Sequence, residues 1–505
     1  MWILGAPLHH RRVDPATLPD DVDLLKGIVV EQRDQLSALH RAMEKMAYQL
    51  ARLERQTFGT KSEWIDPNQL PLIEGLAPPP APATPESEKP AEPRRRSRHG
   101  RSRLPRHLPV VQVETKVENR TCGNCGGELA HIGELESERL EYIPGRFERL
   151  VIVREKCACP NCPSEGVQIA ESPRFAIDRA LCGDGLLAHV LTQKFADHNP
   201  LNRQAKQFTR AGVTIPVSTM CGWVKAGADL LRRIVLAMKT ELLASDFVQS
   251  DATGLPILEG DQNHRKNGCL WAYGNEDHVV YEVTDTHEGR HPREFLVGFE
   301  GTLLCDGASN FNEIAATPGI RRAGCWAHCR RYFFEALTSD RDRATTAMAY
   351  IRRVFEIERE IKDKDAAERA RLRIAHTKPI LDQFAAWLSE QRATAPPSSP
   401  FGRAVTYTTN QWSTLKTFLE NGSIPADNNQ SERNLRGPVV GRKNWLFAGS
   451  EGGAKAAATM FSIVGSCQLH GVDPWAYLRD VLPVIADVKV TELHKLTPAA
   501  YAARA

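Results

Sequence analysis

No apolar run in the sequence approaches the ~20 residues that a membrane-spanning helix needs. The first residues, MWILGAPLHHRR, contain an apolar stretch that is too short for a secretory signal peptide. Twelve cysteines without such a signal indicate reduced thiols, some of them bound to metal, and argue against a disulfide framework. We therefore expect a cytoplasmic protein.

Neither sign of charge is in large excess, because the net charge is only +3. A hydrophobic content of 42% and a charged content of 25% are ordinary for soluble proteins. The chain of 505 residues is too long for one hydrophobic core, so several domains are expected.

A heptad pattern runs through residues 22–55, which contain no proline. Apolar side chains fill two seams at seven-residue intervals, with Gln32 as the polar exception. The pattern keeps a period of about 3.5 rather than 3.6 residues, which favours a coiled coil and therefore a homo-oligomer. A single amphipathic helix packed on its own domain is the alternative. The seam residues are Val22, Leu25, Val29, Leu36, Leu39, Met43, Met46, Leu50 and Leu53.

A Pro/Ala/Glu-rich segment at 77–93 cannot bury a core and predicts a linker. It continues into 94-RRRSRHGRSRLPR-106, which has seven arginines and no acid. A solvated, disordered charge run is one interpretation. We favour a segment that binds DNA phosphates without reading sequence, which would place the protein at the nucleoid. The arginines concerned are Arg94, Arg95, Arg96, Arg98, Arg101 and Arg103.

Two C-x-x-C pairs, 122-CGNC-125 and 159-CPNC-162, flank a stretch that is rich in strand-forming residues. This spacing predicts a zinc ribbon in which each pair gives two sulfurs to one tetrahedral Zn²⁺. Chance spacing and redox-active thiols are the alternatives. Four thiolates leave no open coordination position, so the zinc is expected to be structural. The ligands would be Cys122, Cys125, Cys159 and Cys162, with Cys157 as a spare.

Residues 184–240 have helical periodicity interrupted by turn signals. Asn199-Pro200 predicts the start of a second helix, Gly212 its end, and Ser218 the cap of a third. Short helices joined by tight turns are typical of a helix-turn-helix, whose basic residues contact DNA. A small helical spacer fits the pattern almost equally well. The basic residues available to DNA are Arg203, Lys206 and Arg210.

From residue 245 to about 336 the pattern changes to short strands bounded by Gly, Asn and Asp. Asp251 and Asp306 are each expected at the end of an apolar strand. Carboxylates at neighbouring strand ends can converge above a sheet, and a third on a helix would complete a site for Mg²⁺. Two such ions can activate a water or a 3′-hydroxyl against a phosphodiester. Strand-end acids are also common turn formers, which is the alternative.

The third carboxylate is sought in 425-PADNNQSERNLRG-437, after a mainly helical segment at 340–420. Asp427 and Gln430 have the spacing of a capping box, which makes Asp427 the expected cap. A helix is predicted from there to about Arg436, ended by Gly437-Pro438.

Within that helix, Leu435 is expected to face the core, which turns Glu432 toward the sheet. Glu432 is therefore the expected metal ligand. A surface ion pair with Arg436, four residues on, is the alternative. The basic residues expected to contact DNA here are Arg433, Arg436, Arg442 and Lys443.

Several stretches together resemble the transposases of the insertion sequence 66 family, over nearly the whole chain. The most specific are 324-GCWAHCRR-331, ADNNQSERNLRG at 426–437 and 441-GRKNWLFAGS-450. Further matches are FGTKSE at 58–63, the two C-x-x-C pairs, 199-NPLNRQ-204 and 471-GVDPWAYL-478.

The resemblance implies an RNase H-like domain with a DDE triad of Asp251, Asp306 and Glu432 and a helical insertion before the glutamate. It implies an enzyme that uses Mg²⁺ or Mn²⁺ to cut and rejoin double-stranded DNA at element ends and in target DNA, without a covalent enzyme intermediate. Accessory proteins from the same element are also implied.

Cys325 and His328 match a C-x-x-H feature that many DDE enzymes carry, and they are expected to support the triad. A buried cysteine and a core histidine explain them equally well. One residue departs from the family pattern, because Ala252 stands where a glutamate usually follows the first aspartate. The side chain at position 252 would point away from the acids, so the chemistry should survive. A contact that the usual glutamate would make with DNA, or with residues behind the acids, would be lost.

The fold expected from these observations is multidomain. Its parts are a coiled-coil helix at 1–70, a linker at 71–106, a zinc ribbon at 107–178, a helical DNA-binding region at 179–243, an α/β RNase H-like catalytic domain at 244–465 with a helical insertion at about 340–420, and a C-terminal helical element at 466–505. A nuclease of the same fold that only cuts, and a non-catalytic zinc-containing DNA-binding regulator, are the rival functions.

Overall fold

The computed structural model describes residues 145–158, 167–259, 264–315 and 317–504, with some helical residues between 26 and 46. The chain divides into two units, Met1–Ala77 with Leu150–Ala505, and Pro78–Arg149. The four predicted zinc ligands, the arginine run and part of the heptad seam lie outside the described residues. None of the described helices is long and apolar enough to cross a membrane.

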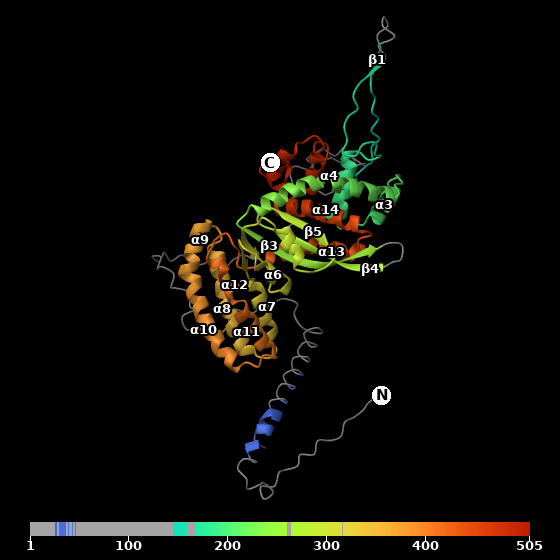
Figure 1. The fold of residues 1–505 in the computed structure, drawn as a ribbon. Coiled ribbons are helices and arrows are strands. Elements are labelled where there is room, and N and C mark those ends of the chain that lie inside the picture. Colours follow the sequence, from blue (N-terminus) through green and yellow to red (C-terminus); the bar gives the residue numbers. More distant parts are fainter. Residues whose placement is uncertain are drawn as a thin grey trace, which may run out of the picture. The chain divides into compact units, whose positions relative to one another are not determined.

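A five-stranded mixed sheet is the framework of the described chain (Figure 1). The strand order is β5-β4-β3-β6-β7, in which β3, β4 and β5 are antiparallel neighbours and β6 and β7 run parallel to β3. The predicted strand segments are confirmed. The strands are β3 (Phe247–Glu259), β4 (His264–Gly274), β5 (Val279–Thr284), β6 (Gly301–Leu304) and β7 (Ile320–Ala323).

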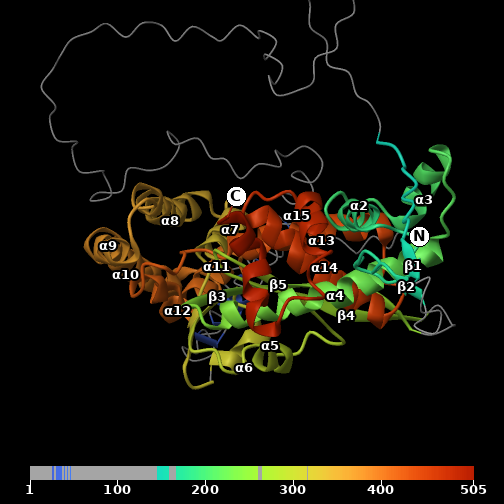
Figure 2. The same ribbon diagram turned by 90° about the horizontal axis from the view of Figure 1, so that it is seen from above.

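Helices cover both faces of this sheet (Figure 2). On one face lie α13 (Asn429–Trp445) and α14 (Glu451–Leu469). The hydroxyl groups of Ser462 and Ser466 on α14 accept hydrogen bonds from backbone N–H groups of β5, at 2.8 and 3.0 Å, which satisfies donors on this edge strand. On the other face, Phe295 of α5 (Arg290–Phe295) stacks on Tyr273 of β4. The short α6 (Asn312–Ala315) lies near α5.

Three helices precede the sheet, as predicted: α2 (Asp184–Phe195), α3 (Leu201–Arg210) and α4 (Val217–Leu243). The second starts after Pro200 and ends before Gly212, whose φ of +84° is readily adopted only by glycine. The prediction that Ser218 caps the third helix is wrong. Pro216 is the residue before α4, and its fixed φ starts the helix two residues earlier without a side-chain cap. Before α2, β1 (Lys156–Ala158) pairs with β2 (Val167–Ile169) in a small antiparallel sheet.

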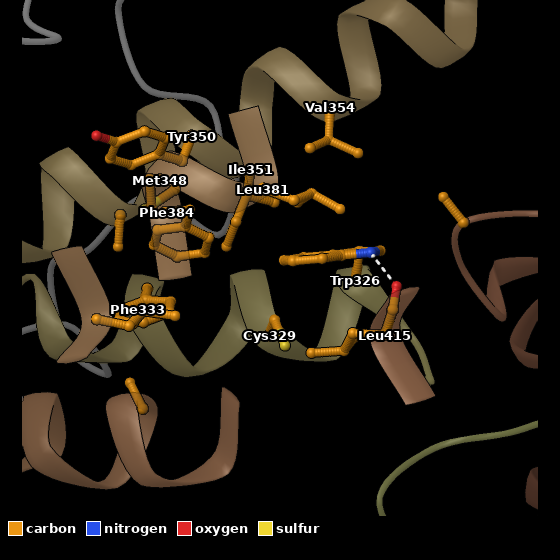
Figure 3. Close-up of a cluster of buried hydrophobic side chains, with 14 of the residues drawn as sticks. Trp326, Cys329, Phe333, Met348, Tyr350, Ile351, Val354, Leu381, Phe384 and Leu415 are labelled. Carbon is orange, nitrogen blue, oxygen red and sulfur yellow. Dashed lines mark hydrogen bonds between the residues drawn. The ribbon is translucent and has the colours of Figure 1, made fainter. Parts of the chain in front are cut away.

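The predicted helical insertion follows β7 and α7 (Trp326–Ala336). A Pro-Ser stretch interrupts it between α10 and α11. Its core contains buried aromatic and aliphatic residues, and Trp326 donates from Nε1 to the carbonyl oxygen of Leu415 at 2.9 Å (Figure 3). The insertion is thereby packed on the helix that leaves the sheet. Its helices are α8 (Arg341–Glu360), α9 (Ala366–Leu372), α10 (Lys378–Thr394), α11 (Pro400–Asn410) and α12 (Trp412–Lys416), with a π-helical turn at Arg373–Thr377.

A buried arginine connects this insertion to the segment before α13. Arg373 is 1% exposed and forms an ion pair with Glu358 at 2.6 Å. Its guanidinium group also donates to the carbonyl oxygens of Phe418 and Asn421, at 2.7 and 3.0 Å. Because a buried charge is costly unless it is paired and hydrogen-bonded, these contacts fix the path of the chain toward α13.

After α14, the chain ends in α15 (Pro474–Val481) and α16 (Pro498–Ala502). The carboxylate of Asp473 accepts hydrogen bonds from the first N–H groups of α15, which is a normal helix cap. The stretch GVDPWAYL therefore starts a capped helix at this point.

Candidate active site

The two aspartates of the predicted triad lie level with each other on neighbouring strands. The parallel register pairs Phe247 of β3 with Thr302 of β6, and Gln249 with Leu304. Continuing this register by two residues places Asp251 beside Asp306, just past the end of β6. The pairing of β3 with β6 ends two residues before the two carboxylates.

The position of Asp251 differs from the prediction in one respect. Asp251 lies inside β3 and not at its end, because β3 continues to Glu259 in its antiparallel pairing with β4. It lies opposite Ala272, on the sheet face that α13 covers. Asp306 does follow the end of β6, as predicted, and its Oδ1 accepts a hydrogen bond from the N–H of Ala308 at 3.0 Å.

Asn428 fixes the helix that carries Glu432. Its side-chain Nδ2 donates to the carbonyl oxygen of Ser250 at 3.0 Å, directly next to Asp251 in β3. Its backbone N–H donates to Sγ of Cys325 at 3.2 Å. Asn428 is completely buried. The first turn of α13 is therefore tied both to the strand of Asp251 and to the start of α7.

The predicted capping box at the start of α13 is wrong. Asn428 occupies the cap position and makes no side-chain cap, whereas Asp427 accepts from the N–H of Asn429 at 3.0 Å in a local turn. Gln430 bonds to Asn434 and Arg433 and does not reach back to the cap. Nδ2 of Asn428 donates to Ser250, and its Oδ1 is buried without a hydrogen-bond partner, so the side chain is turned to β3 and not to the N–H groups of its own helix.

The predicted end of this helix at Gly437-Pro438 is also wrong, because α13 continues to Trp445 with Pro438 inside it. Proline has no N–H to donate to the carbonyl oxygen four residues earlier, which belongs to Asn434. The hydroxyl of Tyr281 on β5 donates to that oxygen instead, at 2.6 Å. A tertiary contact thus replaces the missing helical hydrogen bond.

The far end of α13 is tied to β3 as well. The guanidinium group of Arg442 donates to the carbonyl oxygen of Gly254. Ala448, just after the helix, exchanges backbone hydrogen bonds with Pro256 and Leu258 at 2.9 Å. Both ends of α13 are therefore anchored to the strand that carries Asp251. Arg433, Arg436 and Lys443 are exposed, and Leu435 is buried as predicted.

Glu432 does not pair with Arg436 but contacts α7. Its Oε2 lies 3.4 Å from Nη2 of Arg331, and its Oε1 lies 3.7 Å from Nε2 of His328. Arg331 lies within GCWAHCRR, but no local sequence signal indicates this role, because the contact joins residues that are far apart in the chain. Cys325 is buried, and burial is the main cause that raises the pKa of its thiol to about 11.

Asp306 and Glu432 lie close enough to Asp251 to act on it electrostatically. The pKa of Asp251 is raised to about 6, mainly by burial and further by the carboxylates of Asp306 and Glu432. The N–H of Ala252, 2.7 Å from Oδ1, and the guanidinium group of Arg331 act in the opposite direction. Burial also lowers the pKa of His328, which disfavours its charged form. The site carries surplus negative charge.

The acids fit a divalent cation by their chemistry. Within the described ranges, no group of three or more His, Cys, Asp and Glu side chains is arranged so that it could hold a metal ion. However, Oε1 of Glu432 is buried without a hydrogen-bond partner, which is costly unless a cation or donor satisfies it. Carboxylate oxygens are the ligands that Mg²⁺ prefers, and this group has three carboxylates. Arg331 supplies part of the compensating charge.

Comparison with known proteins gives the class of this protein. Residues 179–456, more than half of the chain, match the family described as "Transposase IS66 family". Residues 119–163 match "zinc-finger binding domain of transposase IS66", residues 45–113 "Transposase C of IS166 homeodomain", and residues 462–499 "IS66 C-terminal element". The chain belongs to the IS66 transposase family.

Curated relatives cover most of the chain. The uncharacterized protein y4jD of Sinorhizobium fredii (strain NBRC 101917 / NGR234) is 30% identical over 95% of this chain and 96% of its own length. From the same organism, y4hP is 35% identical over 75% of this chain and 73% of its own length, and y4qI is 29% identical over 96% and 97%. The chain is thus a multidomain protein with a zinc-finger domain, an N-terminal helical region and a mixed-sheet α/β domain.

Proposed function

We propose that the protein is a DDE transposase that cuts and rejoins phosphodiester bonds at the ends of a bacterial insertion sequence. The observation that carries this proposal is the arrangement of Asp251, Asp306 and Glu432. They come from β3, from the end of β6 and from α13, and Asp306 and Glu432 both raise the pKa of Asp251. The mixed sheet with a helical insertion before the third acid supports an RNase H-like domain.

Each of the three acids would hold a divalent cation, Mg²⁺ or Mn²⁺, through carboxylate oxygens. Such ions, when bound, activate a water or 3′-hydroxyl and stabilise the leaving oxygen, so that no covalent enzyme intermediate is needed. Asn428 orients the helix of Glu432 against β3. Arg331 and His328 contact Glu432 and limit its rotation. Cys325 supports the site by accepting the N–H of Asn428.

DNA would be held by basic residues around the acids. Arg433, Arg436 and Lys443 lie on the exposed side of α13, and the arginine run at 94–103 would add sequence-blind phosphate contacts. Arg442 is engaged with the backbone of Gly254 and would act by anchoring α13. The structural Zn²⁺ would be bound by the two C-x-x-C pairs, and the protein would act at the nucleoid as a homo-oligomer with accessory proteins of its element.

The test is a product assay with the purified protein, Mg²⁺ and duplex DNA that carries candidate element ends. Joined products are expected. Cut products without joining would instead support a nuclease of the same fold. Binding without either product would support the non-catalytic regulator.

A further inference from the structure

Two sequence motifs that lie outside the three acids meet in the structure. Arg203, in NPLNRQ, lies on α3, and Asn444, in GRKNWLFAGS, lies in the last turn of α13. Nη1 of Arg203 donates to Oδ1 of Asn444 at 3.4 Å. These residues are 241 positions apart, so the contact joins two separate parts of the chain.

The turn before α3 is held closely against α13. A Cβ atom on Gly441 would lie 3.2 Å from Nδ1 of His198 and 3.0 Å from Nε1 of Trp445, so glycine permits the approach. His198 adopts a φ of +56°, in the left-handed region that non-glycine residues seldom occupy. This conformation persists because the surrounding structure holds it. The start of α3 is therefore positioned by α13.

The NPLNRQ motif also fixes the turn from within. Nδ2 of Asn199 donates to Oε1 of Gln193 and of Gln207, at 3.1 and 2.9 Å. Gln204 is completely buried, and its Nε2 donates to the carbonyl oxygens of Asn199 and Val190, at 2.9 and 3.3 Å. With these amides turned inward, the basic side chains of α3 are left facing solvent.

The exposed sides of both helices are basic. On α13 the exposed cations recur at positions that share one side of a helix, and on α3 they recur at three- and four-residue steps. In the described part of the chain, none of them forms an ion pair with a carboxylate within 4.0 Å; Arg433 bonds to the neutral Gln430 and acts on Asp427 only through its charge. The cations are Arg433, Arg436 and Lys443 on α13, and Arg203, Lys206 and Arg210 on α3.

We infer that these six side chains form one phosphate-binding track, the α13–α3 track, for duplex DNA that leads away from Glu432. The inference rests on the proposed function and extends its DNA surface to α3. Glu432 to Lys443 spans about 16 Å and Arg203 to Arg210 about 10 Å along their helix axes. Together they match at most about 8 nucleotides of one strand at 3.4 Å each. These cations lie near the three acids and form no ion pairs with the carboxylates that the structure describes. Such a surface suits a polyanion as its partner better than it suits a protein surface of mixed charge.

The test compares Arg203→Gln/Lys206→Gln/Arg210→Gln with a control, Lys362→Gln/Lys364→Gln/Arg392→Gln, which removes the same charge from exposed positions of the insertion. Both are made in the full chain with the arginines of 94–103 replaced by Gln, so that this run does not mask the effect. Affinity for a random duplex of about 25 base pairs is measured by fluorescence anisotropy without Mg²⁺ over a range of salt. The track variant is expected to bind at least about tenfold more weakly, with a salt slope lower by up to about 2.7.

Lys206→Gln/Arg210→Gln, which keeps the bond of Arg203 to Asn444, is expected to lower the slope by up to about 1.8. An unchanged affinity and slope in the track variants, or an equal loss in the control, would overturn the inference. The product assay separates it from the proposed chemistry. The parent is the chain in which only the arginines of 94–103 are replaced. If this parent joins DNA and the track variant binds as tightly as the parent, only the inference about the α13–α3 track is wrong. If the track variant loses binding while the parent neither cuts nor joins, the track stands and the chemistry fails.

Discussion

The hydroxyl of Tyr281 donates a hydrogen bond of 2.6 Å to the carbonyl oxygen of Asn434, the acceptor that Pro438 leaves without its helical partner. Through this contact a strand of the sheet keeps α13 continuous past a proline. The continuity matters because α13 carries Glu432 near its start and Lys443 near its end.

Tyr281→Phe is expected to destabilise α13 by about 1–3 kcal/mol, because the part-buried carbonyl oxygen of Asn434 then loses this donor. Hydrogen exchange of the α13 backbone amides measures this local opening. Pro438→Ala is the matched control, since alanine restores the N–H that reaches Asn434. In that background Tyr281→Phe should cost less than about 1 kcal/mol. An equal cost in both backgrounds would show that the hydroxyl does not replace the helical bond.

The raised pKa of Asp251 predicts a pH dependence of stability in metal-free protein. The pKa is near 3.9 when unfolded and about 6 when folded, so between these values the folded state holds a proton that the unfolded state lacks. The free energy of unfolding contributed by this group therefore falls as pH rises through this window.

Asp251→Asn removes this effect, so relative to the wild type its stability should increase by about 1–2 kcal/mol between pH 4 and pH 7. Thermal unfolding at several pH values measures the difference, with the exposed Asp229→Asn as the control. Mg²⁺ should stabilise the wild type more at pH 7 than at pH 5, since a bound cation compensates the ionised carboxylates. A pH-independent difference would show that Asp251 is not the buried acid described here.

Zinc is predicted to be structural in the 107–178 module. Cys122→Ser or Cys159→Ser should unfold this module and weaken binding to element ends, because metal binding and folding form one equilibrium in such ribbons. Elemental analysis should find one zinc per chain in the wild type and in Cys157→Ser, the predicted spare. Native protein without zinc would rule the prediction out, and loss of zinc in Cys157→Ser would make that residue a ligand.

The heptad seam is predicted to hold protomers together. Leu36 and Leu39 are 68% and 62% exposed in the single chain, as expected for side chains that a second helix would cover. Leu36→Lys with Leu39→Lys should split the assembly and stop the joining of paired ends, whereas Gln35→Lys with Ser37→Lys, outside the seam, should not. Sedimentation of the full chain and of residues 1–70 measures this. A wild-type fragment that is monomeric at tens of micromolar would place the contacts between protomers elsewhere.

The strands and helices with strong local signals could be predicted from the sequence. Alternating apolar residues bounded by Gly, Asn and Asp located the sheet, and Asn199-Pro200 and Gly212 located the ends of α3. Local patterns failed at α13, where the expected stop at Gly437-Pro438 is overridden by Tyr281, 153 residues away. The expected cap at Asp427 failed because α13 starts one residue later, with Asn428 at the cap position and bonded to Ser250 on a distant strand.

The acids of the candidate site could be proposed from the sequence because their residue types and the family motifs single them out. Their surroundings could not. The contact of Arg331 with Glu432 joins residues 101 positions apart, and the link from Arg203 to Asn444 spans 241. Such pairs depend on how α7, α3 and α13 pack, which no local pattern encodes.

The central claim is that Glu432 acts with Asp251 and Asp306 in cutting and joining DNA. The most direct test is the yield of joined product from element-end DNA with Mg²⁺ for Glu432→Gln, beside Glu335→Gln, an exposed glutamate on α7. We predict that Glu432→Gln binds DNA as the wild type does and gives no joined product, as should Asp251→Asn and Asp306→Asn, whereas Glu335→Gln joins normally. Near-normal joining by Glu432→Gln would contradict the account.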